Sequence, residues 1–188
     1  MAYEASPSAG PPRAAPAQSF NELGEMRIAL SRNTRAENVA LLNQILADTI
    51  TLRDLYKKHH WQASGAVFYQ LHLLFDQHHD QQEDLVDAIA ERIQTLGGVA
   101  IAMAPDVAET TLLARPPRDR EEPSQQLERL VGAHERVLLI VRAGARRAAE
   151  LGDDGTQDLL VGDVIRTNEK QAWFVHQHLQ RNRPSGAR

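Results

Sequence analysis

Hydrophobic positions recur at helical spacing along the first third of the chain. From residue 34 to about 61, mostly apolar side chains follow one another at intervals of three and four: Val39, Leu42, Ile45, Leu46, Thr49, Leu52 and Leu55. This period predicts a helix, and the sequence Thr34-Arg35-Ala36-Glu37 predicts its start as a capping box. Gly65 predicts a turn, and a second helix over about 66–96 should end at Gly97 and Gly98.

The second half of the chain predicts another pair of long helices. Residues 99–122 form a proline-broken connection in which 107–113 predict a short helix. A third helix should begin near Pro123, a favourable first-turn residue, and end near residue 151. A fourth should follow Asp153 and continue to about residue 180. No strand-like alternation appears, so the prediction is an all-α fold: two helical hairpins joined by a long crossover, the layout of ferritin-like four-helix bundles.

Composition places this bundle between two polar tails. Residues 1–20 are rich in proline and alanine and predict a disordered tail without a secretory signal. The bundle is expected over residues 21–180, followed by an arginine-containing tail over 181–188. The absence of cysteine excludes a disulfide scaffold and thiolate metal ligands. No apolar run approaches the length of a membrane span, and a net charge of −4 gives no general attraction to nucleic acid. We therefore expect a cytoplasmic protein.

The predicted second helix carries two distinct faces. Its core face consists of Phe68, Leu71, Phe75, Leu85, Ile89, Ile93 and Leu96. A second stripe, centred about 130° away at 3.6 residues per turn, consists of His72, Asp76, Asp80, Glu83, Asp87 and Glu91. The simplest interpretation is a solvated acidic face. However, His60 and Trp61 precede the stripe, and histidine with carboxylates at helical spacing favours a transition-metal site, with iron the expected metal.

The stripe is symmetric about a point between Gln81 and Gln82. Two copies of this helix packed antiparallel about a two-fold axis there would place His72 and Asp76 of one chain opposite Glu91 and Asp87 of the other. Within one chain, residues 76 and 87 lie about 16 Å apart along the helix axis, too far to share a metal. No glutamate is followed three residues later by histidine, which disfavours an intrachain di-iron site. The spacing therefore predicts a metal site shared between two subunits.

The residues that carry this pattern also carry a family resemblance. The segments KKHHWQASGAVFYQLHLLFD and DAIAERIQTLGG, with ELGDDGTQDLL and the late Trp173, resemble the Dps family of miniferritins, the DNA-binding proteins from starved cells. The family pattern is a histidine before tryptophan, then histidine, two aspartates and a glutamate at set intervals. All five positions are present: His60, His72, Asp76, Asp87 and Glu91.

The resemblance implies a hollow dodecamer built from two-fold dimers. It implies ferroxidase centres in which His60, His72 and Asp76 of one subunit face Asp87 and Glu91 of its mate. It further implies oxidation of Fe(II), preferably by hydrogen peroxide with oxygen as the other oxidant, and storage of ferric mineral. Trp61 would lie beside the centre as an oxidisable aromatic.

Other polar residues have weaker assignments. Asp153, Asp154 and Asp158 fit helix capping, although the resemblance implies a pore that admits Fe(II) there. His134 is expected in the core, and His59 is interpreted as a structural residue or a support for the ligands. His79 is interpreted as a surface or interface residue, with an additional ligand for iron in transit as the alternative. Arg181, Arg183 and Arg188 are the candidates for DNA contact, which the net charge does not favour. A nucleoid-associated, DNA-compacting protein whose metal site is secondary is therefore the alternative function, and a purely structural oligomer is a third.

Overall fold

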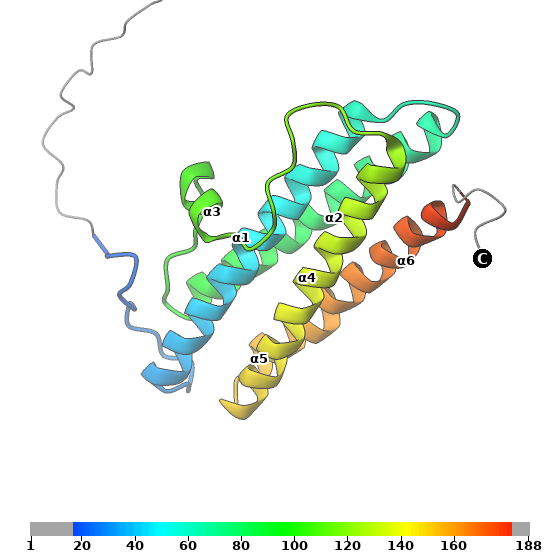
Figure 1. Cartoon of the computed structure of the whole chain (residues 1–188). Helices are drawn as coiled ribbons and strands as arrows, with labels where there is room; N and C mark the ends of the chain where they lie inside the picture. Colours follow the sequence, from blue (N-terminus) through cyan, green and yellow to red (C-terminus); the bar gives the residue numbers. More distant parts are fainter. Residues whose placement is uncertain (1–16, 182–188) are drawn as a thin grey trace, which may run out of the picture.

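The computed structural model describes residues 17–181, which are helical with no strand among them. The elements are α1 (Arg32–Gln62), α2 (Phe68–Thr95), α3 (Ala104–Thr110), α4 (Pro123–Glu150), α5 (Asp154–Asp158), the π-helix η1 (Leu159–Ile165) and α6 (Arg166–Arg181). The long helices α1 and α2 form one antiparallel hairpin, and α4 with the continuous α5–η1–α6 run forms the other (Figure 1). The short α3 lies outside the bundle beside α1 (Figure 1). The predicted four-helix layout with a helix in the crossover is confirmed.

The helix ends correct two details of the prediction. Ser31 caps α1, because its hydroxyl accepts a hydrogen bond from the backbone N–H of Thr34 at 3.0 Å. The capping box predicted at Thr34 and Glu37 is therefore wrong, and Glu37 instead pairs with Arg147 of α4. Helix α3 begins three residues earlier than predicted, since Pro105 occupies its first turn rather than breaking it.

A single apolar core fills the space between the four long helices. Of the predicted core face of α2, all but one member is buried. The exception is Phe68, which is 44% exposed because it stands at the first residue of α2, where the hairpin opens to solvent. Its ring lies against His72 instead, with the centroids 5.2 Å apart. Within residues 17–181, no helix is both long enough and apolar enough to cross a membrane.

Buried polar side chains of α1 fix the crossover. Asp48, which is 1% exposed, accepts hydrogen bonds from the Thr111 hydroxyl at 2.8 Å and the Leu112 N–H at 2.6 Å. Asn43 accepts from the Ile101 N–H and donates to the Val99 carbonyl. These bonds hold both ends of α3 against the bundle.

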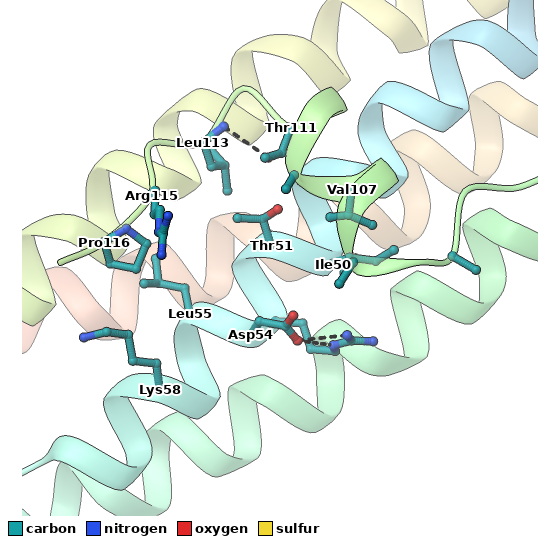
Figure 2. Close-up of a pocket in the computed structure, with 14 residues that line it drawn as sticks. Ile50, Thr51, Asp54, Leu55, Lys58, Val107, Thr111, Leu113, Arg115 and Pro116 are labelled. Carbon is teal, nitrogen blue, oxygen red and sulfur yellow. Dashed lines mark hydrogen bonds and ion pairs between the residues drawn. The ribbon is translucent and has the colours of Figure 1, made fainter. Parts of the chain in front are cut away.

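A groove of about 710 Å³ lies between α1 and the α3 segment (Figure 2). Its walls include Ile50, Val107 and Leu113, and no histidine lines it. Asp54 is its only carboxylate, and it is held in an ion pair by Arg53 at 2.8 Å. The groove therefore lacks the set of histidine and carboxylate ligands that a transition metal requires.

The segment before α1 is fastened to the end of α2. Gln18 donates to the Gly97 carbonyl at 2.9 Å, and Arg35 donates to the carbonyls of Gly24 and Leu96. Chain packed against the bundle thus begins a few residues before the predicted boundary at residue 21. Residues 1–16 and 182–188, which hold most of the two predicted tails, lie outside the described residues.

Gly97 is expected to tolerate no side chain at this junction. Its φ is +84°, and a Cβ would lie 2.8 Å from the Gly24 carbonyl oxygen and 2.9 Å from the Arg35 guanidinium. Gly65 has nearly the same φ, +82°, but nothing within 4 Å of its Cβ position. Gly65→Ala should cost about 1 kcal/mol for the left-handed backbone alone. Gly97→Ala should lower the free energy of unfolding by distinctly more in chemical denaturation, and equal losses in the two variants would contradict this packing.

Candidate metal centre

Two histidines from neighbouring helices stack face to face at one end of the α1–α2 hairpin. The rings of His60 and His72 have centroids 3.8 Å apart at an interplanar angle of 21°. Nδ1 of His60 lies 2.8 Å from the carbonyl oxygen of His72, and Nδ1 of His72 lies 3.0 Å from the carbonyl oxygen of His60. A carbonyl only accepts, so each Nδ1 carries the proton. Both Nε2 atoms therefore keep a lone pair for a metal ion.

An ionised carboxylate lies beside this histidine pair. Asp76 Oδ1 is 2.6 Å from Lys57 Nζ and 3.7 Å from His60 Nδ1. The hydrogen bond from the Lys57 ammonium holds the pKa of Asp76 below its usual range. The side chain is 43% exposed, so it can reach an incoming cation. Lys57 was not singled out in the sequence, because nothing in its spacing links it to a carboxylate nineteen residues away.

The other two predicted ligands lie further along α2 and apart from this cluster. Asp87 and Glu91 are exposed and form no ion pair among residues 17–181. None of the six stripe residues is buried, as the prediction of a face turned away from the core requires. Within the described part of a single chain, no three acidic or histidine side chains converge closely enough to hold a metal ion. One subunit thus holds the five predicted ligands in two separate groups.

An open groove of about 710 Å³ adjoins the three-residue half. It is lined by Lys57, Trp61 and His79 together with the Arg53, Asp54 and Glu83 ion-pair group. Trp61 is 71% exposed. His79 Nδ1 lies 3.1 Å from Asp80 Oδ1 at the edge of the stripe. The groove thus reaches Lys57, the ion-pair partner of Asp76.

Three further histidines, His59, His78 and His134, are core residues. His134 is fully buried and hydrogen-bonded to Tyr56 and Asn168, so the predicted core role is confirmed. His59 is also fully buried, and burial lowers its pKa to about 4. His78 is buried against Tyr56, and burial lowers its pKa to about 3. All three side chains lie inside the bundle, apart from the exposed stripe.

The aspartates at the start of α5 divide into two kinds. Asp153 is 1% exposed, caps α5 through the Thr156 N–H, and pairs with Arg92 at 2.5 Å. That carboxylate is enclosed and neutralised within the bundle, so capping accounts for it and it does not offer a free charge to a pore. Asp154 and Asp158 are exposed and stay the predicted pore residues.

The predicted DNA contacts fall at the edge of the described chain. Arg181 is the last residue of α6. Arg183 and Arg188 lie outside the described residues. Their role stays a prediction.

The bundle, its crossover helix and the histidine–carboxylate surface together define a ferritin-like protein. The family model of the ferritin-like domain matches residues 39–183. The fold of DpsC from Streptomyces coelicolor superimposes with a TM-score of 0.87 and 51% identity, covering 88% of this chain and 96% of that one.

Two further comparisons narrow the family. The DNA protection during starvation protein of Agrobacterium fabrum is 31% identical over 80% of this chain and 93% of its own length. A Dps protein from Vibrio cholerae, described as a member of a broad superfamily of ferritin-like diiron-carboxylate proteins, has a TM-score of 0.77 over 82% of this chain and 96% of its own; at 24% identity it supports the fold. This chain belongs to the Dps family.

Proposed function

We propose that this protein is a ferroxidase and iron-storage protein that oxidises Fe(II), preferably with hydrogen peroxide. The observation that carries the proposal is the stacked His60–His72 pair, in which each Nδ1 is engaged by a carbonyl, with the ionised Asp76 3.7 Å from His60 Nδ1. Two neutral imidazoles and a carboxylate are ligands that suit Fe(II). Membership of a family with ferritin-like diiron-carboxylate relatives supports the same chemistry.

The second half of each centre is proposed to come from another subunit. The two-fold axis between Gln81 and Gln82 would bring Asp87 and Glu91 of a mate to the three-residue half-site. The two exposed carboxylates without an ion pair would then gain a cation as partner, which offsets their mutual repulsion. As in the Dps pattern, six such dimers would close a dodecameric cage that stores ferric mineral.

The ligand set favours the loss of an electron from bound iron. Carboxylates stabilise Fe(III) more than Fe(II), while histidine retains enough affinity for Fe(II) to load the centre. Fe(II) would compete with the Lys57 ammonium for the Asp76 carboxylate, which Lys57 engages through Oδ1. Peroxide that takes two electrons from paired Fe(II) releases no hydroxyl radical, which makes the reaction protective.

Anaerobic titration tests this proposal. Fe(II) bound to the purified protein should be oxidised by hydrogen peroxide at a ratio of two Fe(II) per peroxide, and the protein should sediment as a cage of twelve subunits. Oxidation no faster than in protein-free buffer would contradict the proposal.

DNA compaction is the alternative, and it depends on the tail arginines. The net charge of −4 does not favour binding to nucleic acid. A mobility-shift assay across salt, with and without residues 181–188, separates the two functions.

A further inference from the structure

A tyrosine is enclosed at the centre of the bundle between two histidines. Tyr56 of α1 is fully buried. Its hydroxyl lies 2.5 Å from Nε2 of His134 on α4 and 3.1 Å from Nδ1 of His78 on α2. The metal stripe uses none of these three side chains.

The surrounding hydrogen bonds fix the direction of the phenol proton. Asn168 donates its Nδ2 to the Val164 carbonyl at 2.8 Å, which turns its Oδ1 toward His134 Nδ1 at 2.9 Å. His134 therefore carries its proton on Nδ1, and its Nε2 accepts from the Tyr56 hydroxyl. The phenol oxygen in turn accepts from His78 Nδ1.

This arrangement suits loss of an electron together with a proton. Burial raises the pKa of Tyr56 well above its ordinary value, so the phenol does not ionise by itself. Oxidation of a phenol makes it a strong acid, and its proton must then move to a base. His134 is neutral, since burial lowers its pKa to about 4, and it already accepts the hydrogen bond.

Tyr56 also lies close to the proposed iron centre. It precedes His60 by four residues on α1, which is about 6 Å along the helix axis. Its ring centroid is 6.0 Å from that of Phe75, the residue before Asp76. An electron can cross from Tyr56 to the centre over about one helical turn.

We infer that Tyr56 is a redox-active residue that consumes hydroxyl radical formed at the iron centre, with His134 as its proton acceptor. The inference rests on the proposed function. It concerns a centre loaded with a single Fe(II), where peroxide takes one electron and gives Fe(III), hydroxide and hydroxyl radical.

With that reaction of Fe(II) and peroxide as the first step, the electrons and protons balance over three steps. Hydroxyl radical takes one electron from Tyr56 and becomes hydroxide, while the phenol proton moves to His134 Nε2 and leaves a neutral tyrosyl radical beside an imidazolium. A second Fe(II) reduces the tyrosyl radical, and the proton returns from His134 to the phenol oxygen. The sum is two Fe(II) and one peroxide giving two Fe(III) and two hydroxides.

Electron paramagnetic resonance on the full chain tests the inference. Protein loaded with substoichiometric Fe(II), mixed with hydrogen peroxide and frozen rapidly, should show a tyrosyl radical. The chain has three tyrosines, Tyr3, Tyr56 and Tyr69. The signal should persist in a Tyr3→Phe/Tyr69→Phe double variant, which leaves the buried cluster intact, and disappear in Tyr56→Phe. Loss in the double variant, or a tryptophanyl radical in its place, overturns the inference.

A His134→Gln variant separates proton transfer from structural support. The glutamine amide oxygen can accept the Tyr56 hydrogen bond but cannot accept its proton. The tyrosyl yield should therefore fall severalfold in a variant that still folds and assembles. An unchanged yield would overturn the role of His134.

Iron oxidation, followed by absorbance in the same samples, separates failure of the proposed function from failure of the Tyr56 inference. A wild-type protein that does not oxidise Fe(II) contradicts the proposed function. A wild-type protein that oxidises Fe(II) at full rate without any tyrosyl radical overturns the Tyr56 inference alone.

Discussion

His72→Ala is expected to slow peroxide-driven Fe(II) oxidation by at least about tenfold, the lower end of what loss of a metal ligand or its immediate support costs. The substitution removes one imidazole ligand, and with it the bond from His72 Nδ1 to the His60 carbonyl and the stacking of the two rings, so His60 also loses support. Stopped-flow absorbance of ferric formation measures the rate.

Asp76→Asn should have an effect of similar size for a different reason. The amide keeps the shape of the side chain but removes the charge that attracts Fe(II), and it leaves the Lys57 ammonium without an anionic partner. His176→Ala is the matched control, since His176 is exposed on α6, where it bonds Gln180 and lies outside the stripe. Oxidation kinetics unchanged in both site variants would rule out the stripe as the reaction centre.

Asp153→Ala is expected to destabilise the fold by about 3 kcal/mol, as removal of one partner from a buried ion pair does. The carboxylate joins three elements: it bonds Arg92 of α2, Asn38 of α1 and Thr156 of α5. Its loss leaves the Arg92 guanidinium, which is only 19% exposed, without an anion.

Asp154→Ala is the control for this position. Asp154 is the neighbouring residue, exposed in the first turn of α5, and its removal should cost no more than about 0.5 kcal/mol of helix-dipole interaction. Chemical denaturation at fixed protein concentration measures both. If Asp153→Ala changed iron uptake while leaving the free energy of unfolding intact, Asp153 would belong to a pore and not to the core.

The sequence predicted the features that depend on the regular spacing of apolar residues. Helical periodicity located all four long helices, because each buries a continuous apolar stripe and no strand pattern competes with it. The exposure of the stripe on α2 followed from the same period. Phe68 is the exception. It has the spacing of the core face, but it is exposed because it is the first residue of α2.

Contacts between distant residues could not be predicted in this way. Ser31 caps α1 in place of the predicted Thr34, and Glu37 pairs with Arg147, more than a hundred residues away, instead of closing a capping box. The Lys57–Asp76 bond and the Tyr56–His134 bond also join different helices. No local spacing signals them, because the rotation of one helix against another decides which side chains meet.

The central claim is that two subunits share each iron centre, and mixed cages test it most directly. His72→Ala and Glu91→Ala chains, each inactive alone, would be co-expressed with different tags and purified as mixed assemblies. In a dimer of one chain of each kind, one of the two centres combines an intact His72 with an intact Glu91. Random pairing then restores about a quarter of the centres. The account predicts that mixed cages regain fast Fe(II) oxidation at that level, and mixed cages as inactive as either parent would contradict it.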